Sequence, residues 1–131
     1  MKAIGTFSVA CRTPTDVVPD PAVATALPVG IAQIEKEFAG EITGRSTTLF
    51  AFDQATGAGM YVAMESIEGA LHDRVGSFAH SATTLGTDRT AEFFTIVPTS
   101  GAGELTGITG TGGLTVDTDG VHHIWFDYEL D

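Results

Sequence analysis

The chain has 131 residues, 43% of them hydrophobic, a length that suits one domain with its own core. Its formal net charge is −11, with 6 lysines and arginines against 17 aspartates and glutamates. Nucleic acids and anionic membrane surfaces are excluded as expected partners, because both are bound through basic faces.

The termini and the cysteine content favour a cytoplasmic protein. Residues 2–12 alternate between apolar and polar positions instead of forming the apolar run of a secretory signal. No stretch has the roughly 18 consecutive apolar residues of a transmembrane helix. Cys11 is the single cysteine and has no internal partner for a disulfide, which fits a reducing compartment.

The composition predicts an all-β fold. The chain contains nineteen threonines and 8 phenylalanines, and threonine, β-branched and aromatic residues favour strands. The alternation over residues 2–12 predicts a first strand, with Ala3, Gly5, Phe7, Val9 and Cys11 on one face. Residues 13–28 hold four of the five prolines and are expected to form a long crossover loop or a lid.

Seven further strands are expected after this loop. The pattern places them at residues 29–38, 41–53, 60–68, 75–83, 90–97, 113–118 and 121–130. Turns are expected at Ala39-Gly40, at Thr56-Gly57, over the polar residues 86–89 and at Asp119-Gly120.

Residues 99–113 are unusually rich in glycine, with six of the chain's sixteen. The apolar residues Leu105, Ile108 and Leu114 are spaced through and after this stretch, which distinguishes it from a flexible linker. A dinucleotide-binding loop is excluded because the third glycine of the G-x-G-x-x-G motif and the following helix are both missing. We therefore expect a structured corner between two strands.

Eight antiparallel strands in an open sheet would leave exposed edges, and closure is the simplest way to remove them. The sequence thus predicts one domain, residues 1–131, folded as an eight-stranded antiparallel β-barrel that is closed like the lipocalins. A barrel of eight strands has room inside for packed side chains or for one small ligand.

A series of motifs over residues 30–130 resembles a known family. The motifs are Lys36-x-Phe38-x-Gly40-x-Ile42-x-Gly44, Tyr61-x-Ala63-x-Glu65-x-Ile67-Glu68-Gly69, Gly76-Ser77-Phe78, Val97-Pro98-x-Ser100-Gly101-x-Gly103-Glu104-Leu105-x-Gly107-Ile108-x-Gly110 and Asp127-Tyr128-Glu129-Leu130. Their order resembles that of a bacterial family of small barrels within the allene-oxide-cyclase-like superfamily. The resemblance implies a barrel with an internal pocket. It also implies cyclisation or coupling of reactive intermediates without a cofactor, and a homo-oligomer such as a dimer or trimer.

The candidate catalytic residues share inward faces of neighbouring strands. Alternation places Glu65 with Tyr61 on one expected strand, and Lys36 with Phe38 on another. A buried carboxylate needs a partner or a raised pKa, and Lys36 is the expected partner. Glu65 could act as a general acid or base with Tyr61 and Lys36 orienting the substrate. The alternative is a structural Lys–Glu pair without turnover.

The same faces predict the pocket walls and the outer surface. Residues expected to contact a substrate are Phe38, Phe50, Phe78, His80, Phe126 and Tyr128. The alternative for each is simple core packing. Residues expected to point outward and form an oligomer interface are Met60, Val62, Met64 and Trp125.

No metal or cofactor is expected, because the scattered histidines and the lone cysteine lack metal-ligand spacing. The sequence leaves three hypotheses for function. The first is a cofactor-independent cyclase or isomerase that folds a small hydrophobic intermediate, in a specialised, polyketide-type metabolism. The second is a barrel that binds an apolar ligand without turnover. The third is a structural oligomer with a packed interior.

Overall fold

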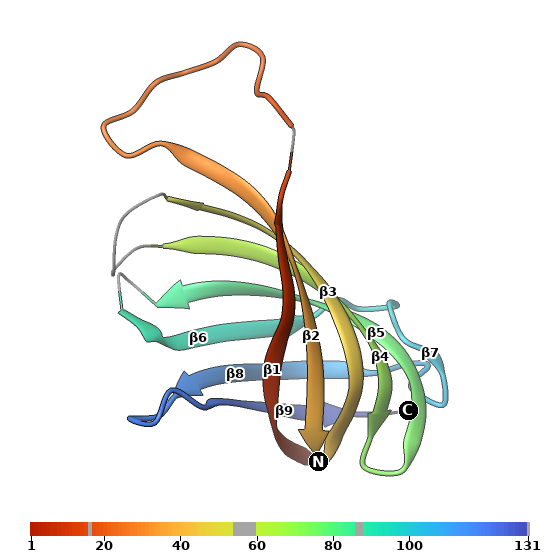
Figure 1. Ribbon diagram of the computed structural model, residues 1–131. Helices are drawn as coiled ribbons and strands as arrows, with labels where there is room; N and C mark the ends of the chain where they lie inside the picture. The colour runs from red at the N-terminus through yellow and green to blue at the C-terminus, as the bar shows by residue number, and fades with distance from the viewer. Residues whose placement is uncertain (16, 54–59, 86–87, 131) are drawn as a thin grey trace.

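The computed structural model describes residues 1–15, 17–53, 60–85 and 88–130, with side chains except at residues 85 and 88–91, and within them every regular element is a strand (Figure 1). The strands are β1 (Lys2–Pro14), β2 (Val29–Gly40), β3 (Ile42–Asp53), β4 (Tyr61–Leu71), β5 (Arg74–Leu85), β6 (Asp88–Ile96), β7 (Ala102–Gly103), β8 (Thr109–Val116) and β9 (His122–Glu129).

Eight of these strands form a closed antiparallel barrel. The sheet runs in the order β4-β3-β2-β1-β9-β8-β6-β5, and pairing of β4 with β5 closes the ring. The two-residue strand β7 pairs with the beginning of β5, where Gly76 lies opposite Gly103. Closure leaves each of the eight long strands with two partners, and the predicted eight-stranded antiparallel barrel is confirmed.

Alternation along the strands selects the residues that fill the barrel. On β4, Ala63, Glu65 and Ile67 are buried while Val62 and Met64 are exposed. The inward faces predicted for β2, β3 and β9 are also observed, with Phe38, Ile42, Ser46, Ile124 and Phe126 among their buried residues. The alternation of the sequence therefore predicts correctly which residues of these strands point into the barrel.

The first strand departs from its predicted face in its second half. Ala3, Gly5 and Phe7 are buried as expected, and Val9, although 47% exposed, still lines the interior of the barrel, but Cys11 is exposed outside it. The pairing of β1 with β2 shifts between Val9 and Cys11, so a bulge interrupts the alternation there. Beyond the bulge β1 stays paired with β2 as far as Pro14 and Ala32.

The glycine-rich stretch divides into a corner and a strand. The seventh long strand was expected at 113–118, but β8 already begins at Thr109. Gly110 and Gly112 permit this early start, because a Cβ at either position would overlap a backbone carbonyl of β9. Leu105 and Ile108 of the corner are fully buried and cover one end of the barrel, which we call the closed end.

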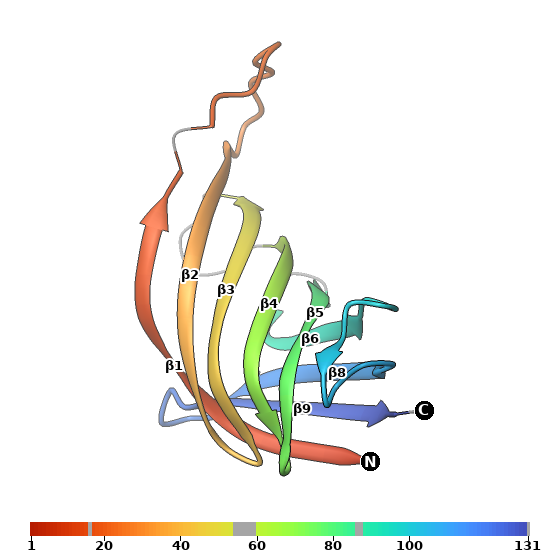
Figure 2. The same cartoon turned by 90° about the vertical axis from the view of Figure 1, so that its right-hand side faces the viewer.

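The loop between β1 and β2 projects away from the barrel (Figure 2). Residues 17–29 are all exposed, including Val18 at 80% and Val23 at 79%. Its role as a lid stays a prediction. The turn expected at Thr56-Gly57 and the centre of the turn expected at 86–89 lie outside the described residues.

The corner generates a test of barrel closure. An alanine Cβ at Gly101 would overlap the Leu105 carbonyl and press on the Ile108 side chain, so we expect Gly101→Ala to lower the free energy of unfolding by about 2–3 kcal/mol. At Gly120 an added Cβ meets nothing within 4 Å, and only the positive φ of 82° opposes it, at a cost of about 1 kcal/mol. Urea denaturation measures the free energy of unfolding of Gly101→Ala and of Gly120→Ala. Equal decreases for the two variants would contradict the proposed packing of the corner.

Candidate functional site

The barrel contains a cavity of about 280 Å³ at the end opposite the glycine corner. We call this the open end; Val116 and His122, which flank the turn between β8 and β9, both line it. All eight long strands contribute to its wall. Its lining residues are Phe7, Val9, Ile34, Lys36, Thr48, Phe50, Tyr61, Ala63, Glu65, Ala82, Glu92, Phe94, Leu114, Val116 and His122.

A polar cluster spans four neighbouring strands beside this cavity. Register places Lys36 on β2 opposite Ser46 on β3, and Glu65 on β4 opposite both Thr48 on β3 and His80 on β5. Side chains directly opposite each other in an antiparallel pair lie within contact distance. The pairing of four strands therefore brings five polar side chains together, and all five are buried.

Glu65 is the centre of this cluster and is 1% exposed. Its Oε1 accepts a hydrogen bond from His80 Nε2 at 2.8 Å and lies 3.4 Å from Lys36 Nζ. The Ser46 hydroxyl donates to Oε2. Both carboxylate oxygens are thus occupied, and Lys36 is found at the place that the sequence predicted for the partner of Glu65.

Burial alone would raise the pKa of Glu65, since a charge is poorly stabilised away from water. The hydrogen bond from His80, the charges of Lys36 and His80, and the Ser46 hydroxyl together outweigh burial and lower the pKa of Glu65 to about 2. The carboxylate is therefore ionised across the physiological pH range. So weak a base with both oxygens engaged suits a counter-ion better than a proton acceptor.

His80 is 0% exposed and packs among aromatic rings. Its ring centroid lies 4.5 Å from that of Phe94 and 5.1 Å from that of Phe126. Nδ1 faces the backbone carbonyl of Ser81 at 3.3 Å, while Nε2 faces Glu65. Both ring nitrogens are therefore directed at protein oxygen atoms and not at the cavity.

Two polar groups of the cavity retain hydrogen-bonding capacity. The Thr48 hydroxyl is buried, and among the described residues it has no hydrogen-bond partner. Lys36 Nζ, which has three N–H donors, lies 3.4 Å from Glu65 and 4.4 Å from the centre of the Phe7 ring. An unpartnered buried hydroxyl costs free energy, so a bound group that pairs with Thr48 would be stabilised.

The predicted substrate contacts separate into two groups. Of these residues Phe50 lines the cavity, where its ring centroid lies 6.2 Å from that of Tyr61, one of the candidate catalytic residues. Phe38, Phe78, Phe126 and Tyr128 are buried in the core, and His80 lies among these rings. None of these five is among the lining residues of the described cavity. Their role in binding stays a prediction.

Tyr128 instead contributes to a polar contact away from the cavity. Its hydroxyl lies 2.5 Å from Nδ1 of His72, whose Nε2 is 3.4 Å from a carboxylate oxygen of Glu41. Burial raises the pKa of the Tyr128 hydroxyl, which the nearby Arg74 charge opposes. These contacts connect β9 to the β4–β5 turn and to the residue before β3.

The sequence analysis did not single out Thr48, Ser46, Phe7 or His122 as site residues. Alternation places Ser46 and Thr48 on the same face of their strand as Phe50, but serine and threonine are common in strands and do not by themselves indicate a site. The ring of His122 lies 4.8 Å from the ring of Phe7, and His122 lines the cavity. Its neighbour His123 is on the opposite face and contacts Asp117 at 2.8 Å.

The pKa of His122 is lowered, first by burial and then by the charge of Lys36.

In the described part of the chain, no group of three or more histidine, cysteine, aspartate or glutamate side chains could hold a metal ion. A search of the same residues for a helix long and apolar enough to span a membrane finds none.

Comparison with known proteins identifies the family. Residues 3–128 match the family described as "Protein of unknown function (DUF3224)". The chain belongs to the DUF3224 family. It is similar to a protein of unknown function from the DUF3224 family of Shewanella oneidensis MR-1, whose crystal structure is known at 1.84 Å resolution. The two share 33% sequence identity and superpose with a TM-score of 0.80, over 100% of this chain and 98% of the other.

The search of curated proteins gives no match. The resemblance to a bacterial family of small barrels is thus confirmed at the level of the DUF3224 family. Its wider placement in the allene-oxide-cyclase-like superfamily stays an inference from the motifs.

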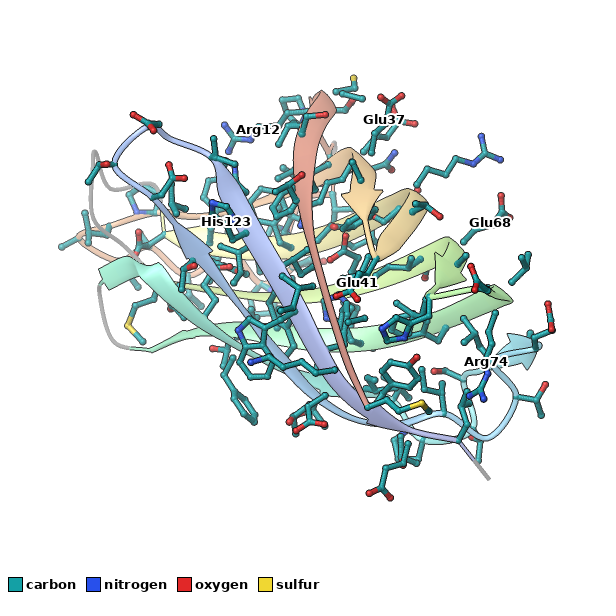
Figure 3. The ribbon with its side chains drawn as sticks, turned by 90° about the horizontal axis from the view of Figure 1, so that it is seen from below. Arg12, Glu37, Glu41, Glu68, Arg74 and His123 are labelled. Atoms are coloured by element: carbon teal, nitrogen blue, oxygen red, sulfur yellow. The ribbon has the colours of Figure 1, made fainter. Side chains whose placement is uncertain are left out.

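The cluster predicts a large difference between two glutamates of β4. Glu65→Gln leaves Lys36 and His80 buried without a counter-ion, and we expect it to lower the free energy of unfolding by about 3–5 kcal/mol. Glu68 points outward (Figure 3) and forms an ion pair with Arg45. The Glu68 side chain is 71% exposed and that of Arg45 is 78% exposed. Glu68→Gln should therefore change stability by no more than about 0.5 kcal/mol in the same denaturation assay. Similar losses for both variants would refute a special role for the buried carboxylate.

The pKa of Glu65 also predicts a pH dependence. Because the pKa falls from 4.5 to about 2 on folding, the ionised carboxylate stabilises the protein fully above pH 4.5. This contribution is lost as the pH falls from 4.5 towards 2. We expect the stability difference between the wild type and Glu65→Gln to shrink by about 3 kcal/mol over that window. Denaturation curves collected from pH 6 to pH 2 measure it, and a constant difference would be inconsistent with this pKa.

Proposed function

We propose that the barrel binds a small, mainly apolar molecule that carries an oxygen acceptor, such as a ketone. The observation that carries this proposal is the buried Thr48 hydroxyl, which has no hydrogen-bond partner among the described residues and lines the same cavity as the Lys36 side chain. Buried polar groups in folded proteins nearly always have a partner. A ligand oxygen that accepts from Lys36 and Thr48 would supply one.

The size and lining of the cavity define the ligand class. At the packing density of protein interiors, 280 Å³ holds a molecule of roughly 12 non-hydrogen atoms. Most of the wall is apolar, including Ile34, Phe50, Phe94 and Leu114. A molecule with an apolar body and one polar end therefore fits better than a sugar or a nucleotide.

The second candidate is a cofactor-independent cyclase or isomerase. The position of Lys36 favours it, because an ammonium on an apolar wall can stabilise negative charge that develops on a substrate oxygen. Confinement of one ligand conformer by the barrel would add to the rate. The resemblance of the motifs to those of allene-oxide-cyclase-like barrels also supports a cyclase. Its substrate would then belong to a specialised, polyketide-type metabolism.

Self-association is a separate proposal. Met60, Val62 and Met64 are between 49% and 60% exposed on the outer face, and Trp125 is half-buried under Lys2. A dimer or trimer that covers these side chains is compatible with a ligand site inside each barrel. The cavity argues against the third hypothesis, in which the interior is packed and holds no ligand.

Three small ketones test the binding proposal: α-tetralone, phenylacetone and 2-cyclohexenone. We expect the wild type to bind at least one of them more tightly than tetralin, a hydrocarbon of similar shape to α-tetralone. Thr48→Val removes the hydroxyl with little change of volume. It should weaken ketone binding about tenfold and leave tetralin binding unchanged, because one hydrogen bond of about 1.4 kcal/mol is lost.

Thr47→Val is the matched control, because Thr47 is exposed on the outer face of the same strand. It should leave ketone binding unchanged. Thr48→Val should also raise the free energy of unfolding by about 1 kcal/mol, since it removes a buried hydroxyl without a partner. Calorimetry and urea denaturation measure both effects. If no ketone binds better than tetralin, the proposed function is wrong.

A further inference from the structure

We infer that His122 is a general base that removes a proton from the carbon next to a ligand carbonyl, while Lys36 and Thr48 hold the carbonyl oxygen. The inference rests on the proposed function, since it requires a ketone in the cavity. The three side chains belong to different strands, β9, β2 and β3, and all line the same cavity.

Proton abstraction next to a carbonyl needs a neutral base and an electrophile that face the same small volume. The Phe7 ring connects the two sides of this cavity. Lys36 Nζ lies 4.4 Å from its centre, and the ring of His122 lies 4.8 Å from it. A ligand packed against Phe7 would therefore be close to both groups.

The other titratable groups near the cavity are less suited to the task. Both oxygens of Glu65 already accept hydrogen bonds, and both nitrogens of His80 face acceptors. Tyr61 also lines the cavity, but its phenol is a donor rather than a base at neutral pH. Glu92 lines the cavity and has interactions of its own.

Electrostatics supports the choice of His122. Burial and the charge of Lys36 lower the pKa of His122 from its ordinary value of 6.5, so that the imidazole is neutral at physiological pH. Glu65 meanwhile provides Lys36 with a fixed negative partner. The cavity thus presents a neutral base and a cationic electrophile at once, the combination that carbonyl enolisation requires.

The reaction balances without a cofactor. The imidazole of His122 accepts the proton, and the C–H electron pair becomes the carbon–carbon double bond of an enolate. The carbonyl π electrons move to oxygen, where the Lys36 ammonium and the Thr48 hydroxyl donate hydrogen bonds to the oxyanion. Delivery of a solvent-derived proton from His122 to the same carbon gives exchange, and in a β,γ-unsaturated ketone delivery to the γ-carbon gives the conjugated enone. Both regenerate neutral His122.

Hydrogen–deuterium exchange tests this step. The three ketones are incubated with the full chain in D2O, and the loss of their α-proton signals is followed by NMR. We expect the wild type to accelerate exchange of a bound ketone by at least about 100-fold over buffer, a typical contribution of a general base. His122→Gln should lose this acceleration while its affinity for the ketone changes less than about threefold.

His123→Gln is the matched control. His123 is adjacent in sequence but pairs with Asp117 outside the cavity, and it should exchange the ketone at the wild-type rate. The pH profile of the wild type is a second readout that does not depend on a variant. The rate should rise with pH as His122 loses its proton, with an inflection below pH 6.5 and a plateau above it.

The possible results separate the two proposals. If a ketone binds but its α-protons exchange no faster than in buffer, the inference is wrong and ligand binding stands. The inference also fails if His122→Gln exchanges as fast as the wild type, or if the rate shows no inflection below pH 6.5. If no ketone binds better than tetralin, both proposals fail.

Discussion

The burial of one carboxylate is the constraint on which the interior depends. Glu65 is 1% exposed, and an unpaired charge at that depth would cost several kcal/mol. Its partners Lys36, Ser46 and His80 come from three other strands, so the cluster forms only when β2 to β5 pair in the native register. A slip of one residue would turn each partner to the outer face. The ion cluster therefore helps to specify the register of half the barrel.

The two ends of the barrel are built differently. At one end, the corner before β8 inserts Leu105 and Ile108 into the core, and glycines allow its backbone to approach the neighbouring strands. At the other end the wall consists of side chains alone, and a cavity of about 280 Å³ remains. The polar cluster lies between the packed core and this cavity. Closure at one end thus leaves the other free for a ligand.

Periodicity predicted the fold and the Glu65–Lys36 pair, because alternation determines which side chains of a strand point inward. It could not predict the bulge after Val9 or the early start of β8 at Thr109, since both depend on contacts with neighbouring strands. It also could not identify Thr48, whose hydroxyl is notable because it has no hydrogen-bond partner in the described part of the chain. A missing contact is a property of the folded interior and leaves no pattern in the sequence.

Each polar group of the interior affects the ionisation of the next through its charge or its hydrogen bonds. His80 and Ser46 hold Glu65 ionised, and the Glu65 carboxylate lies beside the Lys36 ammonium. Burial, and after it the charge of Lys36, lowers the pKa of His122 on β9, which is separated from β2 only by β1. In the proton transfer that we propose, Glu65 is therefore a positioning residue for Lys36, and His122, Lys36 and Thr48 are the groups that would touch the ligand.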